Sequence, residues 1–127
     1  MQKAIFNIQN ETDFERCALQ VFKYQFQNNK VYRSFCDLLY IHPSDVKEVN
    51  QIPFLPIQFF KTHQILSTNQ SVQEMFTSSG TTGAQVSKHL VSDVSWYEAS
   101  YTNAFEHFYG PVEDYTVLGL LPNYLER

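Results

Sequence analysis

The sequence has no cluster of basic side chains and no long apolar run. Nine lysine and arginine residues stand against thirteen aspartate and glutamate residues, and the net charge of the 127-residue chain is −4. Nucleic-acid surfaces need clustered positive charge to displace phosphate counterions. The longest strongly apolar run, Val117 to Leu121, is far shorter than the ~20 residues that cross a bilayer. We therefore expect neither a nucleic-acid partner nor a membrane span.

Cysteine is scarce as well. The chain has two cysteines and no CxxC pair, and its four histidines are dispersed, which is not the pattern of a disulfide framework or a zinc site. Polar residues interrupt the N-terminal segment, so no signal peptide is expected. These features predict a cytoplasmic protein without a metal site in this chain. Cys17 lies on a predicted apolar helical face and Cys36 follows Phe35, so both are expected to be small buried hydrophobes.

Aromatic residues are abundant. Eleven Phe, eight Tyr and one Trp make up 16% of the chain, whereas charged residues make up 17%. Aromatic side chains bury large areas, and this overall balance is that of a globular domain rather than a disordered segment.

Residues 1–50 are expected to be helical. Thr12, followed three residues later by Glu15, is a capping-box pattern, and apolar residues at helical spacing follow it as far as Asn28–Asn29. A second helix is predicted from Lys30 to Ile41, where His42-Pro43 should end it. The inner face of this second helix is expected to comprise Tyr32, Phe35, Leu38 and Leu39.

Residues 51–71 are rich in proline and phenylalanine. Pro53 and Pro56 forbid a regular helix or a central strand, and the segment is too apolar for a solvated loop. We therefore expect an extended connection that lies over the core.

Residues 72–127 alternate between strand and helix patterns. The sequence predicts a strand at 72–77, a short strand at 89–91, and a helix capped by Ser92 or Asp93 and stopped by Gly110-Pro111. Tyr115 to Leu121 reads as a strand buried on both faces. The predicted fold is α/β, with N-terminal helices followed by an incomplete sheet and a covering helix. Such a sheet lacks neighbours within this chain, so we expect a fragment of a longer protein, one that would self-associate through exposed apolar segments.

The stretch Thr77–Gly83, TSSGTTG, is the most informative one. Glycines allow close backbone approach, successive N–H groups can form an anion nest, and hydroxyls add donors. A Walker A loop is excluded, because two residues separate Gly80 from Gly83 and Lys88 lies five positions further on. On composition alone, a polar hairpin connection is an equally good interpretation.

Three segments in order carry a resemblance to a known family. They are IPFLPIQFFKTHQIL, FTSSGTTGAQVSKHLVSD and LLPNYLER, and together they cover roughly residues 50–127. The second segment resembles the phosphate-binding loop of adenylate-forming enzymes, the acyl-CoA synthetase and luciferase superfamily. The three together resemble the acyl-protein synthetases of bacterial luminescence fatty-acid reductase systems. The resemblance implies that residues 1–127 are the N-terminal part of the large adenylation domain.

The resemblance implies a two-step activity that uses ATP and Mg²⁺. A fatty or related carboxylic acid becomes an acyl-adenylate, and the acyl group then passes to an enzyme cysteine that serves an acyl reductase partner. The magnesium ligands and all catalytic residues are expected outside this chain, which alone should be inactive. Which acyl substrate is used stays open. The residues implied to hold the ATP phosphates are Thr77, Ser78, Ser79, Gly80, Thr81, Thr82 and Gly83.

Two further residues depart from the pattern of the superfamily. Val86 stands where relatives carry a lysine, so Lys88 is expected to serve the phosphates as a displaced substitute, or else to be a solvated lysine. Tyr124 falls near the pocket-gating histidine of relatives, and it either borders the acyl pocket or only packs. Two alternatives to the whole assignment remain, namely an acyl- or aryl-CoA ligase and a stand-alone binding domain without catalysis.

Overall fold

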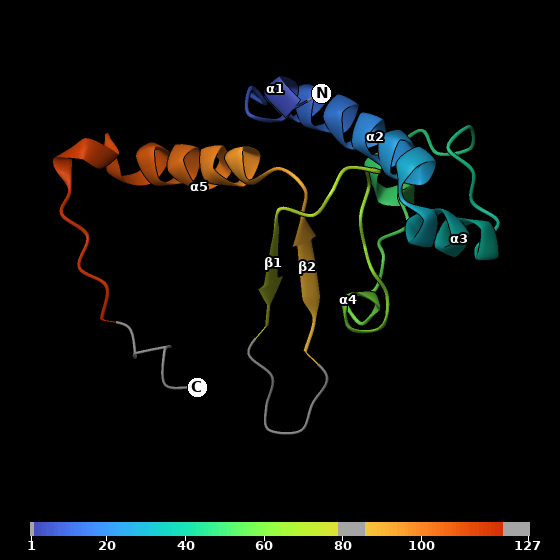
Figure 1. The fold of residues 1–127 in the computed structure, drawn as a ribbon. Helices are drawn as coiled ribbons and strands as arrows, with labels where there is room; N and C mark the ends of the chain where they lie inside the picture. The colour runs from blue at the N-terminus through green and yellow to red at the C-terminus, as the bar shows by residue number, and fades with distance from the viewer. Residues whose placement is uncertain (1, 79–85, 121–127) are drawn as a thin grey trace. The chain divides into compact units, whose positions relative to one another are not determined.

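The computed structural model describes residues 2–78 and 86–120, with side chains described from Ala4 onward. The chain divides into two compact units, residues 1–94 and 95–127, and each is considered by itself. The described elements combine helices with one small antiparallel sheet (Figure 1), which agrees with the expected mixture of α and β structure. Within the described ranges, no helix combines the length and apolarity needed to cross a membrane.

The first unit begins with α1 (Gln2–Ile5) and the long helix α2 (Glu11–Asn28). Asn10 caps α2, because its side-chain oxygen accepts the backbone N–H of Asp13 at 2.9 Å. The expected cap at Thr12 is therefore wrong, and the helix starts one residue before it. Asp13 also accepts a hydrogen bond from Arg16 at 2.6 Å, which links two positions on neighbouring turns.

Asn29 joins α2 to α3 (Lys30–Leu38). Its backbone N–H donates to the carbonyl of Gln25 at 2.8 Å and ends α2, while its side-chain oxygen accepts the N–H of Tyr32 at 3.0 Å and caps α3. Its side-chain nitrogen donates to Oγ of Ser67 at 3.3 Å, and Tyr24 donates to the carbonyl of Ser67 at 3.0 Å. One residue, 4% exposed, thus ends one helix, starts the next and holds a distant segment.

Helix α3 ends earlier than expected. Tyr40 has a left-handed φ of 57°, and the N–H groups of Tyr40 and Ile41 donate to Asp37 and Cys36 at 3.1 and 3.0 Å. This pair of bonds is a Schellman motif, which closes the helix before His42-Pro43 is reached. The inner face consequently comprises Tyr32, Phe35 and Cys36, whereas Leu38 is 78% exposed; the predicted inward position of Leu38 and Leu39 is wrong.

The core of the first unit lies between α2, α3 and the chain that follows them. Partly buried residues that include Ile52 and Leu55 pack against it, and the Tyr32 hydroxyl donates to the carbonyl of Pro53 at 2.6 Å. The proline-rich segment 51–71 thus covers the core in part, but it is not extended throughout, because it forms the helical turn α4 (Phe59–Thr62). The short turn η1 (Val49–Gln51) ends where the segment begins. The buried residues of this core are Phe22, Phe26, Tyr32, Cys36 and Val46.

Burial disfavours ionisation at the centre of this core. Desolvation raises the pKa of the Tyr32 phenol well above its usual range, and the adjacent Cys36 raises it further. Burial likewise raises the pKa of the Cys36 thiol; the hydrogen bond with Tyr32 opposes this shift and the charge of Asp37 adds to it. Both groups are therefore neutral in the folded protein at neutral pH.

The first unit ends with a hairpin of β1 (Glu74–Thr77) and β2 (Lys88–Val91). Both strands lie close to their predicted positions. The backbone N–H of Val94 donates to the side-chain oxygen of Gln73 at 2.8 Å. Gln73, the residue before β1, thus provides the acceptor for the N–H of the first residue of the helix that follows β2.

The second unit contains α5 (Val94–Tyr109) from its second residue onward and the short turn η2 (Val112–Asp114). Helix α5 stops at Gly110, whose φ of 88° is open to glycine at little cost, as the Gly110-Pro111 pair predicts. The Tyr115 hydroxyl donates to the carbonyl of Tyr109, and its ring meets Phe105 edge-on at 5.3 Å. These contacts fold the chain back onto the end of the helix.

The predicted strand from Tyr115 to Leu121 is wrong over the residues that the structure describes. Residues 115–120 have no regular secondary structure, and Leu118 and Leu120 are 85% and 99% exposed rather than buried. An apolar run indicates a segment that needs cover, but a strand also needs a hydrogen-bonding neighbour. No described strand pairs with this segment.

We predict that Asn29→Ala lowers the free energy of unfolding by about 2 kcal/mol, because it removes a helix cap and leaves buried groups without partners. Asn28→Ala is the matched control, since Asn28 is exposed and makes one helix-end hydrogen bond, to the carbonyl of Tyr24. It should change stability by no more than about 0.5 kcal/mol. Urea unfolding of both variants measures the difference, and equal losses would contradict the role of the buried side chain.

We also predict a pH-dependent difference between the wild type and Tyr32→Phe. The variant loses the hydrogen bond to Pro53 and should be about 1–3 kcal/mol less stable at neutral pH. The folded-state pKa of Tyr32 is raised, so its contribution is present below the unfolded-state pKa and is lost as pH rises. The difference in the free energy of unfolding between the wild type and Tyr32→Phe should therefore become smaller above about pH 10. Urea unfolding across alkaline pH tests this; a constant gap would contradict the raised pKa.

Candidate functional site

The β1–β2 hairpin carries the hydroxyl-rich motif. Thr77 is the last residue of β1, Ser78 follows it, and Lys88 is the first residue of β2. The connection between them is the predicted phosphate loop, of which Ser79, Gly80, Thr81, Thr82 and Gly83 lie outside the described residues, as does Tyr124. The motif therefore does join two strands of a hairpin, and this is compatible with either interpretation of its composition.

The strand register brings Thr77 and Lys88 together. They are directly opposed partners in the antiparallel pair, so their side chains leave the same face of the hairpin with Cβ atoms ~5 Å apart. Both residues are exposed. A hydroxyl and an ammonium side by side can donate to the same anionic group.

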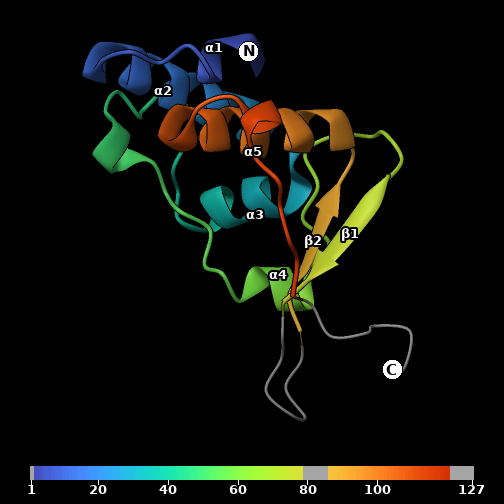
Figure 2. The ribbon, with the colours of Figure 1, turned by 90° about the vertical axis from the view of Figure 1, so that its left-hand side faces the viewer.

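The opposite face of the hairpin is partly covered by α4. Phe76 and His89 are paired on that face, and the ring of Phe60 stacks on His89 with centroids 4.9 Å apart. Both views of the ribbon show α4 beside β2, close to the end at which the connecting loop departs (Figure 2). The face that carries Thr77 and Lys88 is thus the one turned away from this contact.

Ser78 and Ser87 form the neck of the hairpin. The Ser78 N–H donates to the Ser87 carbonyl at 3.1 Å, and Oγ of Ser78 accepts both the N–H of Ser87 at 3.1 Å and its hydroxyl at 2.9 Å. With two bonds accepted, the Ser78 hydroxyl keeps its own proton as a donor. Sequence reasoning missed Ser87, because its partner is defined only by the register of the two strands.

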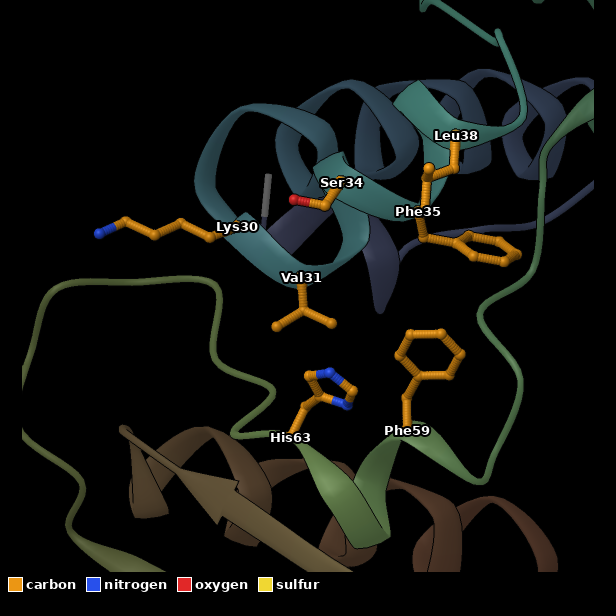
Figure 3. Close-up of a pocket in the computed structure, with 7 residues that line it drawn as sticks. All are labelled: Lys30, Val31, Ser34, Phe35, Leu38, Phe59 and His63. Atoms are coloured by element: carbon orange, nitrogen blue, oxygen red, sulfur yellow. The ribbon is translucent and has the colours of Figure 1, made fainter.

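A second candidate is an apolar hollow of about 310 Å³ between α3 and α4. Figure 3 shows Val31, Phe35, Phe59 and His63 facing one another across it, whereas the Lys30 ammonium points away. The ring of His63 stacks on the ring of Phe59 with centroids 5.1 Å apart, and Nδ1 of His63 is hydrogen-bonded to the Thr62 hydroxyl at 2.8 Å. No set of charged groups converges here, so the hollow offers apolar contact but no catalytic chemistry.

Other chemical groups in the described ranges do not assemble into a site. Residues 2–78 and 86–120 contain no group of three or more His, Cys, Asp or Glu side chains that could hold a metal ion. Cys17 and Cys36 are both free thiols, and both are buried, as expected. Neither is open to an acyl group arriving from solution.

Comparisons with known proteins identify the family. The family described as "Acyl-protein synthetase, LuxE" matches residues 4–103. A long-chain-fatty-acid–luciferin-component ligase from Vibrio harveyi is 38% identical over 69 residues, which are 54% of this chain and 18% of that protein. A ligase of the same name from Photorhabdus luminescens is 29% identical over 70 residues, 54% of this chain and 60% of that sequence. The chain thus spans only part of the length of these relatives, and no solved structure matches it significantly.

The family match covers α2, α3, the whole hairpin and most of α5. It therefore includes the residues that the sequence singles out for phosphate binding. The chain belongs to the LuxE acyl-protein synthetase family.

Proposed function

We propose that this chain is the phosphate-binding part of an ATP-dependent acyl-protein synthetase, within the large domain of an adenylate-forming enzyme. The whole protein would activate a fatty or related carboxylic acid and transfer the acyl group to one of its own cysteines, from which an acyl reductase partner would take it. The family and the ligase names of the relatives support this proposal. The observation that carries it is the hairpin, which sets Thr77 and Lys88 side by side at the base of a glycine- and hydroxyl-rich loop.

The chemistry explains why such a hairpin is useful. A carboxylate oxygen attacks the α-phosphorus of ATP, the bond to pyrophosphate breaks, and an acyl-adenylate forms. A thiolate then attacks the acyl carbonyl, and AMP leaves. Negative charge accumulates on the departing pyrophosphate in the first step, so fixed donors aimed at it lower the barrier.

Each described residue has a role in this proposal. Lys88 supplies positive charge and Thr77 supplies a hydrogen-bond donor to the β- and γ-phosphates, whereas the hydroxyl of Ser78, which accepts two bonds from Ser87, holds the start of the loop. Backbone N–H groups between Ser79 and Gly83 would complete the cradle. Ligands for Mg²⁺ would come from residues elsewhere in the protein.

The test uses the full-length protein that contains this chain. ATP–pyrophosphate exchange that depends on a long-chain fatty acid is expected, together with a hydroxylamine-sensitive acyl group on the protein. An acyl- or aryl-CoA ligase, the alternative, would show the same exchange but would release acyl-CoA and leave the protein unlabelled. Absence of any carboxylate-dependent exchange would overturn the adenylation proposal.

We predict that Gly80→Val impairs adenylation much more than Thr81→Ala does. One lost hydrogen bond to a charged group costs about 1–2 kcal/mol, whereas a β-branched side chain blocks the close approach of the phosphate to the backbone. Exchange kinetics of each variant provide the measurement, with thermal melting as the control for folding. Near-normal exchange by a folded Gly80→Val protein would contradict phosphate binding by the loop.

We further predict that Lys88→Met raises KM for ATP about tenfold, because it removes the charge beside Thr77. Raising the salt concentration should reduce the difference in KM between Lys88→Met and the wild type, since salt screens an exposed charge. Lys47→Met is the matched control, because Lys47 is also an exposed lysine and lies outside the hairpin. If both variants have the same KM, Lys88 is a solvated lysine without a role in ATP binding.

A further inference from the structure

The neck of the hairpin contains a buried hydroxyl that the proposed function leaves unexplained. Ser87 is 6% exposed and is one of two buried polar residues in the described ranges, the other being Asn29. Asn29 is accounted for by the two helices that it joins. The side-chain hydroxyl of Ser87 donates a hydrogen bond to Oγ of Ser78 and is closed to a ligand in solution.

The bonding at the neck departs from a normal antiparallel ladder. The Ser78 N–H donates to the carbonyl of Ser87, as a ladder requires, but the return bond from the Ser87 N–H goes to Oγ of Ser78 and not to its carbonyl. The side chain of Ser78 thus replaces a backbone acceptor at the point where the chain leaves β1. We call these three bonds between Ser78 and Ser87 the serine clasp.

The serine clasp lies immediately next to the pair proposed to meet the phosphates. Thr77 and Lys88 are the last paired residues of the two strands, and Ser78 and Ser87 come directly after them on the side of the loop. The clasp fixes the distance between the two ends of residues 79–86. It also keeps the strands in register at Thr77 and Lys88, so that both side chains stay on one face.

We infer that Ser87 is a positioning residue, which acts through Ser78 to hold the ends of the phosphate loop in the geometry that ATP requires. This inference rests on the proposed function. Ser87 itself does not touch the nucleotide, so its contribution is to pre-organisation, which is sensitive to small displacements. It should affect ATP affinity more than the rate of the chemical step.

The experiment measures KM for ATP and kcat of pyrophosphate exchange in the full-length protein. Ser87→Ala removes one bond of the clasp and should raise KM for ATP about threefold to fivefold with little change in kcat, while Ser78→Ala removes two and should raise KM about tenfold. The double variant should match Ser78→Ala, because both lost bonds end on Oγ of Ser78. Ser78→Thr keeps the oxygen at an exposed position and should restore KM. Ser100→Ala, an exposed serine on α5, is the control.

Two outcomes would overturn the inference. The first is an unchanged KM in a folded Ser87→Ala protein; the second is a further rise in KM when Ser87→Ala is added to Ser78→Ala, since the two serines would then act separately. Amide hydrogen exchange of residues 86–91 provides a readout that does not depend on ATP: loss of the clasp should speed exchange at Ser87. If the wild type shows no pyrophosphate exchange, the proposed function fails, and the amide measurement alone confirms or rejects the clasp.

Discussion

The first unit depends on how one buried asparagine satisfies the backbone at the corner between α2 and α3. Two helices that meet without a loop leave unpaired carbonyls at one end and unpaired N–H groups at the other. Asn29 supplies its own N–H to the first helix and its side-chain oxygen to the second. Its remaining side-chain nitrogen reaches Ser67, so the same corner also anchors the segment that leads into β1.

The arrangement of the hairpin follows from strand alternation rather than from the motif itself. Because successive side chains point to opposite faces, Thr77 and Ser78 cannot serve the same surface in the same way. Thr77 lies with Lys88 on one face, whereas Ser78 turns toward Ser87. A stretch of hydroxyl residues that is uniform in composition therefore divides into side chains that can meet a ligand and side chains that hold the loop.

Local signals in the sequence predicted much of this fold, and non-local ones did not. The gap between α2 and α3, the end of α5 at Gly110 and both strands of the hairpin follow from caps, glycine and residue type over short spans. The end of α3 did not, because Tyr40 adopts a left-handed conformation that its residue type does not favour. The strand expected after Tyr115 required a neighbour, which periodicity cannot supply. Similarly, the partnership of Ser87 with Ser78 depends on register, and no residue spacing reveals it.

A side-chain oxygen replaces a missing backbone acceptor at two places in the first unit, that of Asn29 at the start of α3 and that of Ser78 at the neck of the hairpin. The first N–H groups of α3 have no carbonyl acceptor within the helix, and the side chain of Asn29 accepts one of them, that of Tyr32. The N–H of Ser87 donates to Oγ of Ser78 instead of to a carbonyl, at the point where the chain leaves the strands for the loop. In each case a side-chain oxygen stands in for the missing backbone group. Without such an oxygen, the N–H of a buried residue would lose its partner at a cost of about 1–3 kcal/mol. Side-chain acceptors therefore occur in this unit where regular structure is interrupted, and one of those interruptions is where the loop proposed to hold ATP begins.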